Sequence, residues 1–508
     1  MRRTLSLTLV LVAAMAVAPA APGRADGSFT FYGSGYGHGI GMSQWGAYGL
    51  AQEGWDREEI LTHFFTGTKI AKYGDPPAFL RVGPVQGKSK IRLTAEAGPV
   101  DLLVGDQVKG DLVGTIPDGE TWTVRAAGSQ YKVLDAAGKR VGGQLWGGVD
   151  SHLYAVYAEK GARVQVPESG GHTYNRGYLE LNLYGCTDGC VLRLIIVLDP
   201  QEYLYGIAEV PSSWPMEALK TQADVARSYA FIKAVASQYR SGCNCALYAS
   251  AVDQVYAGWD KEGGTDGDRW VRAVDDTKNE VIKYEGELVQ AFYSPSSGGH
   301  TENNENVWGG NPIPYLRGVC DPGDYTPANT SSVWTVSMTA DEVTKDLGLG
   351  IGTVVDFTDI ERGVSGRIIT ATVEGANGSA TISGITLRSR LGLRDDRVWI
   401  NADRSVTGQI REKYDNLNCS PGLPTSKQTG VASGLRQKFK MATIYYKEGA
   451  GAHELSGAIL DLYLAQGGPG GALGFPTSDV TTKPNGSTTA TFEHGTVTCT
   501  PSGSCSQS

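Results

Sequence analysis

The spacing of apolar residues changes along the chain and predicts one long helix, a β-rich stretch and regions of mixed structure. Residues 216–239 contain no Gly or Pro, and Pro215 suits a first helical turn, with Ser212 and Ser213 as possible caps. Residues 78–200 instead carry short apolar segments separated by Gly, Asp and Pro, which is typical of β-strands. Short helix and strand patterns then alternate as far as residue 400. We therefore expect an α+β fold, not a regular parallel sheet.

The segment 29–70 is built on glycines. A Gly-rich loop spans 33–41, and helical spacing predicts two helices after it, at 42–52 and 57–65. We expect residues 26–403 to form the main domain, made of this segment, the mostly β region 78–200 and a third region at 201–400.

The C-terminal part has a different composition and an internal repeat. Residues 404–437 are rich in Pro, Ser and Gly and predict a linker that includes part of a repeat, followed by a small repeat-containing domain at 438–508. Pro-Thr-Ser occurs at 424–426 and 476–478, and two similar six-residue segments occur at 439–444 and 492–497, which gives offsets of 52 and 53 residues. Two matching offsets indicate a small repeat, with about one full copy and a partial one.

The N-terminus has the pattern of a secretory signal peptide. Arg2 and Arg3 precede an uncharged apolar stretch from Leu5 to Ala18, and small residues follow as far as Ala25. The alternative is a retained membrane anchor. We expect residues 1–25 to be a signal peptide and the exported chain to carry no transmembrane anchor, since no later stretch approaches ~18 apolar residues.

Composition narrows the class of protein further. Hydrophobic residues make up 41% and charged residues 19%, which excludes a chain that is disordered throughout. The formal charge is −9, and an acidic chain argues against nucleic acid as the main partner. A polysaccharide remains compatible, because sugars are held mainly by hydrogen bonds and aromatic stacking.

Eight cysteines in an exported chain predict disulfides. Cys186–Cys190 and Cys499–Cys505 would be local bridges, and Cys320–Cys419 would tie distant segments. The pair Cys243 and Cys245 would close a very tight ring, so zinc binding is the alternative for it. A zinc site needs four ligands and no His stands beside this pair, so we expect no metal cofactor.

The first segment with candidate chemistry is the glycine-rich stretch 35–46. Its glycines allow the backbone to approach a ligand closely, and His38, Ser43 and Gln44 offer polar groups. A structural turn with a buried His is the alternative. A Ser/His hydrolase is disfavoured because Ser43 lacks the GxSxG context of a nucleophile.

The second segment spans 203–229. Glu209 lies among apolar residues, which raise the pKa of a carboxyl as a general acid requires. Lys220 and Arg227 are seven residues apart on the long helix, so both are predicted on one face, where Asp224 would pair with Lys220. That face would bind sugar oxygens or orient a carboxylate. The alternative is a solvated charged face beside an ordinary loop Glu.

The third segment, 291–316, combines Ser, Gly, Thr, Asn, Tyr and Trp in one stretch. This mixture suits a carbohydrate cleft, with aromatic faces for sugar rings and polar groups for sugar oxygens. A surface loop held by its own turns is the alternative. The candidate substrate contacts here are Tyr293, Ser296, Ser297, Thr301, Glu302 and Trp308.

Together the three segments resemble the family of stage II sporulation protein D (SpoIID) and the amidase enhancer LytB, over about residues 29–400. The resemblance rests on GHGIGMSQWGA at 37–47, YLYGIAEVPSSWPMEALKTQADVARSYA at 203–230, SSGGHTENNENVWGG at 296–310, SGR at 365–367 and LRSRLGL at 387–393. It implies action on peptidoglycan. Members include lytic transglycosylases, and others stimulate a cell-wall amidase without cleaving glycan.

The resemblance also implies a role for single residues. It makes Glu209 the catalytic acid and base, with Glu217 as the fallback if the alignment slips, and it makes Lys220 and Arg227 substrate-binding cations. One carboxyl would protonate the glycosidic oxygen and then take the proton of the C6 hydroxyl, which closes a 1,6-anhydro-muramic acid ring. This differs from glycosidases that use two carboxylates.

The order of motifs departs from the usual pattern of the family. The GHG-G-MSQ block normally closes the domain, whereas here it opens the exported chain, which is a permuted order that adjacent termini would allow. If the block docks in the same place, His38 and Gln44 line the same cleft.

The C-terminal part resembles LGFP repeats, named for the residues at 473–476. Such repeats are associated with attachment to cell walls, and a stabilising cap without a ligand is the alternative. We therefore expect a secreted, wall-associated enzyme that acts on peptidoglycan glycan strands. The alternative is a non-catalytic glycan-binding protein that recruits or stimulates an amidase.

Overall fold

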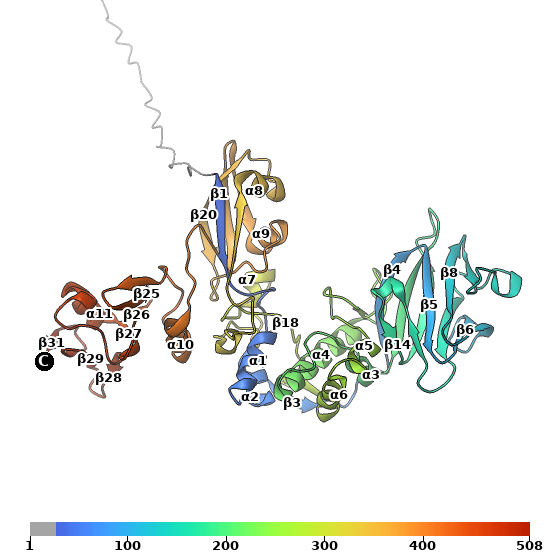
Figure 1. Cartoon of the computed structure of the whole chain (residues 1–508), viewed down its shortest axis with the longest axis horizontal. Helices are drawn as coiled ribbons and strands as arrows, with labels where there is room; N and C mark the ends of the chain where they lie inside the picture. Colours follow the sequence, from blue (N-terminus) through green and yellow to red (C-terminus); the bar gives the residue numbers. More distant parts are fainter. Residues whose placement is uncertain (1–26) are drawn as a thin grey trace, which may run out of the picture.

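The computed structural model describes residues 27–508, and the predicted signal peptide, residues 1–25, lies outside them. Figure 1 shows a β-rich domain at one end, a helical layer beside it, a column of strands and helices around β1, and a C-terminal tail at the other end. The expectation of mixed α+β structure is confirmed. Within the described residues, we find no helix with the length and apolar character needed to cross a membrane.

The β-rich domain contains two antiparallel-dominated sheets that share one hydrophobic core. A seven-stranded sheet has the order β15-β4-β14-β13-β10-β6-β7, and a five-stranded sheet has the order β12-β11-β5-β8-β9. The strands are β4 (Leu80–Lys88), β5 (Lys90–Ala97), β6 (Val100–Gly105), β7 (Asp111–Ile116), β8 (Thr121–Ala127), β9 (Gln130–Leu134), β10 (His152–Tyr157), β11 (Arg163–Gln165), β12 (Thr173–Tyr174), β13 (Tyr178–Tyr184), β14 (Val191–Leu198) and β15 (Leu247–Tyr248). Residues 78–200 are thus mostly β, as their short apolar segments predict.

The helical layer surrounds α4, the longest helix of the described chain. It comprises α1 (Gln44–Gln52), α2 (Arg57–Phe64), α3 (Pro200–Tyr205), α4 (Met216–Ala236), α5 (Trp259–Glu262) and α6 (Gly267–Asp276). A small sheet of β3 (Lys69–Lys72), β16 (Glu280–Tyr284) and β17 (Glu287–Leu288) lies beside it. The predicted serine caps of α4 are wrong, because its N-cap is Pro215 and no side chain caps it. The helix is instead stabilised by burial, since most of its residues are buried.

The start of the described chain is built into the end of the main domain. Strand β1 (Ser28–Gly33) pairs with both β19 (Trp334–Thr339) and β23 (Val398–Ile400), and its Phe29 and Phe31 rings pack on Phe357. The remaining elements of this column and its base are β2 (Met42–Ser43), β18 (Tyr293–Ser294), α7 (Asn304–Trp308), α8 (Ala340–Leu347), β20 (Val354–Arg362), β21 (Ile368–Gly375), β22 (Gly378–Ser383) and α9 (Gly384–Arg390). The permuted motif order is therefore compatible with a closed domain, because the two ends of the domain are hydrogen-bonded neighbours.

The tail consists of two repeats, each a helix followed by a four-stranded antiparallel sheet. The first contains α10 (Gly408–Asn416), β24 (Thr429–Val431), β25 (Gly434–Lys438), β26 (Ala442–Lys447) and β27 (Gly451–Ser456). The second contains α11 (Gly457–Ala465), β28 (Thr481–Thr482), β29 (Thr488–Phe492), β30 (Gly495–Cys499) and β31 (Cys505–Gln507). The stretch 404–437, expected to be a linker with part of a repeat, supplies helix α10, strand β24 and the start of β25 in the first repeat.

Equivalent contacts recur in the two repeats. Tyr414 stacks on Phe439 with ring centroids 5.0 Å apart, and Tyr463 stacks on Phe492 at 4.9 Å. Isolated bridges join Pro424 to Phe439 and Pro476 to Phe492. The tail therefore holds two complete repeats, where the sequence alone indicated one full copy and a partial one.

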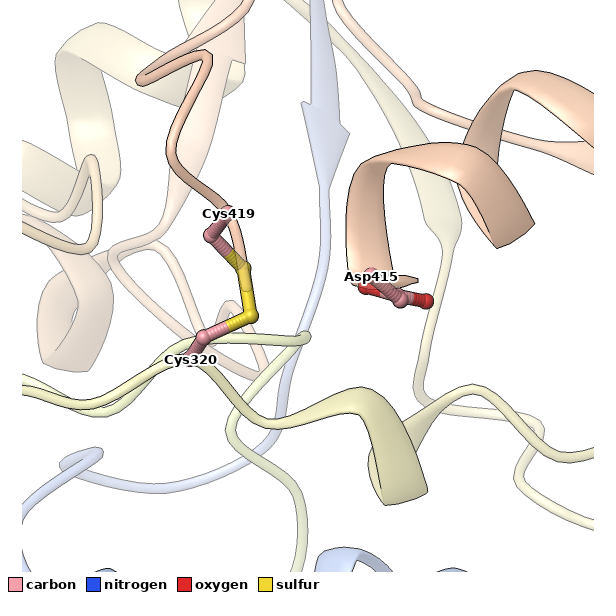
Figure 2. Close-up of side chains that lie close together, drawn as sticks. All are labelled: Cys320, Asp415 and Cys419. Atoms are coloured by element: carbon pink, nitrogen blue, oxygen red, sulfur yellow. A yellow bond between two sulfur atoms is a disulfide. The ribbon is translucent and has the colours of Figure 1, made fainter. Parts of the chain in front are cut away.

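The eight cysteines form the four disulfides considered from the sequence. Cys243 and Cys245 bond to each other, so neither sulfur is a free thiolate for zinc. Figure 2 shows that Cys320–Cys419 joins the main domain to the segment that follows α10, with Asp415 close by. The two sulfurs are bonded to each other and Asp415 pairs with Arg411, so this group is a covalent link between domains and does not fit a metal site.

Candidate functional site

Glu209 lies in the irregular segment between α3 and α4. Its Oε1 accepts a hydrogen bond from the backbone N–H of Val255 at 2.6 Å. Burial raises the pKa of the Glu209 carboxyl above its ordinary value, against the opposing effect of its hydrogen bonds. A carboxyl that keeps its proton to higher pH is suited to donate that proton as a general acid.

Two of the predicted residues approach Glu209 from distant parts of the sequence. The Tyr293 hydroxyl and the Gln44 amide both lie close enough to the Glu209 carboxyl to favour its charged form and lower its pKa. They are brought together because β2, just before Gln44, pairs in parallel with β18, which begins at Tyr293. The Gln44 amide also donates to Gln222 of α4 at 3.1 Å. All three motif segments of the sequence therefore meet at one carboxyl.

A buried chain of hydrogen bonds leads to Glu209 and includes residues that the sequence did not single out. The Tyr203 hydroxyl donates to Gln254 at 3.0 Å, and the Gln254 amide donates to the Tyr293 hydroxyl at 3.1 Å. Burial and the neighbouring Glu209 charge raise the pKa of Tyr293 well above its ordinary value, so this hydroxyl remains a donor. A single Gln outside any motif carries no sequence signal, which explains why Gln254 was missed.

His38 packs beside Tyr293, against aromatic residues of the third segment. Its ring packs against Phe292 and Trp308, with centroids 6.3 and 5.0 Å away, and its Nδ1 accepts a hydrogen bond from the Ile40 N–H at 3.0 Å. Burial, together with the charge of Arg367, lowers the pKa of His38 to about 3, so the ring is neutral at ordinary pH. Trp308 is 44% exposed and is the one residue of the third segment with a large free aromatic face among those predicted.

The predicted serines of this region need correction. Ser43 and Ser296 each donate to a carboxylate oxygen of Asp324 at 2.9 Å, and Ser297 donates to Asp321 at 2.6 Å. All three serines are buried, and the Ser43 hydroxyl also caps α1 by accepting from Gly46. Their hydroxyls hydrogen-bond to the buried Asp321 and Asp324 and link the segment around Ser296 to the start of α1. They are not accessible to a substrate in this structure.

Thr301 and Glu302 have the same framework role. Both are 1% exposed. The Thr301 hydroxyl accepts from the Val319 backbone at 2.8 Å, and the Glu302 carboxylate accepts from the backbone and hydroxyl of Ser365. The predicted direct contact of these two side chains with substrate is therefore not supported by their burial.

The predicted cationic face of α4 also needs correction. Arg227 is 1% exposed and donates to Asp224 at 2.9 Å, and Asp224 is paired with Arg57 as well. Lys220 instead pairs with Glu217 at 3.1 Å and lies 3.6 Å from Asp276, so the predicted Lys220–Asp224 pair is wrong. The helix does place both cations on one side, but that side faces α2, α6 and β16.

Glu217, the fallback for the catalytic acid, belongs to this separate ion-pair group. Its carboxylate accepts from the Arg57 backbone at 3.1 Å and from Lys220. With Asp56 and Glu58 these residues line an open pocket of about 220 Å³ on the surface. The surroundings of Glu217 are charged and solvated, whereas those of Glu209 are not, so the burial that raises a carboxyl pKa is found at Glu209.

Comparison with known proteins bears on this part of the chain. Residues 191–284 match the family model described as stage II sporulation protein (SpoIID), a range that includes Glu209, Gln254 and α4. The chain contains a SpoIID domain. The family model covers the chain from β14 to β16. The glycine-rich segment and the segment at 291–316 lie outside this match, and they contact it through the interactions around Glu209.

A second model, the LGFP repeat, matches residues 422–471. The match begins ahead of the predicted boundary at 438, and it spans the four strands of the first repeat together with helix α11.

Among curated relatives, the chain is 34% identical to "Amidase enhancer" of Bacillus subtilis over 142 residues, or 28% of this chain. The chain covers 17% of the length of that relative. It is 28% identical to "Stage II sporulation protein D" of the same organism over 279 residues, which is 51% of this chain and 76% of the relative.

Proposed function

We propose that the protein is a secreted peptidoglycan lytic transglycosylase whose acid and base is Glu209, and whose tail associates with the cell wall. The observation that carries this proposal is the position of Glu209, a half-buried carboxyl with a raised pKa at the meeting point of three distant segments. The names of its relatives, which refer to sporulation and to enhancement of an amidase, support a role at the cell wall.

The site supplies one carboxyl, which is the number that this reaction requires. Protonated Glu209 donates its proton to the glycosidic oxygen as the bond from C1 of muramic acid breaks. The resulting carboxylate then removes the proton of the C6 hydroxyl, and the C6 oxygen bonds to C1. The products are a strand with a 1,6-anhydro-muramic acid end and a strand with a new free hydroxyl, so water is not consumed.

The neighbours of Glu209 suit both halves of this cycle. The hydrogen bond from the Val255 backbone, together with the nearby Tyr293 hydroxyl and Gln44 amide, stabilises the carboxylate that forms after the first proton transfer. Burial favours the protonated form that begins the next turnover. The balance of these two effects allows the same carboxyl to act as acid and then as base.

The test is mass spectrometry of glycan strands, intact and stripped of stem peptides, after incubation with the chain lacking residues 1–25. We expect 1,6-anhydro-muramic acid ends with the unmodified chain and none with Glu209→Gln. Glu217→Gln is the matched control, since Glu217 belongs to the separate surface group, and it should cleave normally. Reducing ends in place of anhydro ends would refute the one-carboxyl mechanism.

The second candidate is a non-catalytic protein that binds glycan and stimulates an amidase. It is favoured by the 34% identity to a relative named "Amidase enhancer". Strands that are bound but not cleaved, together with faster release of stem peptides by an added amidase, would favour this function instead.

A further inference from the structure

The segment that carries Glu209 is held through its carbonyl groups by two cations. Lys261, from α5, donates its Nζ to the Val210 carbonyl at 2.6 Å. Arg269, from α6, donates Nη1 to Ser212 at 3.0 Å and Nη2 to Trp214 at 2.9 Å. The three carbonyls directly follow Glu209 in a stretch with no helix or strand of its own.

The same part of the chain also holds the other side of Glu209. Trp270 donates its indole N–H to the Leu204 carbonyl at the end of α3, at 2.9 Å. Ala208 and Val255 are joined by a backbone hydrogen bond of 2.9 Å, and the Val255 N–H reaches the Glu209 carboxylate itself. Residues 255–270 thus fix the backbone on both sides of Glu209 and the direction of its carboxyl.

The two cations differ from the other charged groups near the site. Lys261 is 8% exposed, and its ammonium lies 5.0 Å from the centre of the Trp270 ring. Within residues 27–508, neither Lys261 nor Arg269 lies within ion-pair distance of a carboxylate, in contrast to Lys220 and Arg227. A buried lysine without an acidic partner is uncommon, because desolvation of its charge is costly. Its donors are committed instead to the backbone beside Glu209.

We propose that Lys261 and Arg269 are positioning residues for Glu209, a proposal that rests on the proposed catalytic function of this carboxyl. Their hydrogen bonds to alternate carbonyls restrict the backbone rotations of residues 210–214. Since proton transfer requires the carboxyl within hydrogen-bond reach of the glycosidic oxygen, freeing this segment misplaces the acid without removing it. The expected effect is therefore on the chemical step.

The variants that test this are Lys261→Met and Arg269→Gln, with Lys261→Arg and Arg269→Lys as conservative forms. Two cations on neighbouring surfaces serve as controls: Arg272→Gln, on the exposed side of α6, and Lys278→Met just after that helix. We expect Lys261→Met and Arg269→Gln to lower kcat about 10- to 100-fold with KM changed less than about twofold. The conservative forms should recover part of the loss, and the controls should match the unmodified chain.

A second measurement does not depend on catalysis. Hydrogen exchange of the backbone amides in 207–214 should accelerate in Lys261→Met and Arg269→Gln and stay unchanged in the controls. Arg269→Gln keeps the test valid if Lys261→Met fails to fold.

The outcomes separate this proposal from the proposed function. Full activity in both variants, with Glu209→Gln inactive, would overturn the positioning role and leave the function intact. A rise in KM with unchanged kcat would also overturn it, because the cations would then act in binding. If Glu209→Gln is as active as the unmodified chain, the proposed function fails. In that case the positioning role is judged by hydrogen exchange alone, and unchanged exchange of 207–214 in Lys261→Met and Arg269→Gln would overturn it.

Discussion

Replacing Arg227 by Met tests whether this cation holds the fold, as the structure indicates, or binds substrate, as the sequence suggested. Its guanidinium donates four hydrogen bonds, to Asp224 and Glu280 at 2.9 Å and to Val274 and Thr277 at 3.2 Å. The Asp224 side chain has 0% exposure, so Arg227→Met leaves a buried carboxylate with only the partly exposed Arg57 as its partner.

The size of the effect follows from this burial. Removing one partner of a buried ion pair typically lowers the free energy of unfolding by about 3–5 kcal/mol. At about 1.4 kcal/mol per factor of ten, the opening equilibrium of this region should rise by roughly 10² to 10³-fold or more. Lys220→Met is the matched control on the same helix, and its more exposed pair should be worth about 1 kcal/mol or less.

Native-state hydrogen exchange of the α4 amides measures this locally, which suits a chain of several domains. We expect faster exchange in Arg227→Met and nearly unchanged exchange in Lys220→Met, with glycan binding per folded molecule unchanged in Arg227→Met. The reasoning would be refuted if Arg227→Met kept the stability of α4 and lost glycan binding instead.

Two further predictions concern the acid and the tail. Tyr293→Phe removes a nearby hydroxyl that lowers the pKa of Glu209, so the carboxyl should stay protonated to higher pH and the alkaline limb of the kcat–pH profile should move to higher pH; a move to lower pH would contradict this. Deleting 457–508, the second repeat, should reduce retention on isolated cell walls while turnover of soluble strands stays normal, and unchanged retention would refute wall attachment. A deletion from 404 is less informative, because it also removes Cys419, the partner of Cys320.

The sequence predicts the local structure of this chain well where one physical constraint dominates. The absence of Gly and Pro from 216–239 indicates α4, and short apolar segments between turns indicate the β-rich domain. Cysteine spacing suggests the same four pairs that the structure contains, because three short spacings favour local bridges and leave two cysteines for the fourth. Apart from the long-range Cys320–Cys419 bridge, each of these inferences depends on residues that are close together in the sequence.

The sequence is less informative about which partner a polar side chain meets. Helical spacing correctly places Lys220 and Arg227 on one side of α4, but it does not show that this side meets Arg57 and Glu280. In the same way, Ser296 and Ser297 look available for sugars until the two buried carboxylates of Asp321 and Asp324 are located. In this chain, polar residues of the motifs form internal hydrogen bonds of the fold, which the sequence does not distinguish from contacts with a ligand.

In the first repeat of the tail, the content of Pro, Ser and Gly is misleading because the helix in this stretch is too short to give a clear apolar periodicity. Pro, Ser and Gly in 404–437 indicate a linker, yet Gly408, Ile410 and Tyr414 recur in the second repeat as Gly457, Ile459 and Tyr463. The recurrence has a structural reason. In each repeat, an Ile and a Tyr one helical turn apart are buried in the hydrophobic cluster between the helix and the strands. A repeat is therefore better located by the residues that form its core than by its turns, and by that measure the first repeat begins at α10, next to the disulfide that ties it to the main domain.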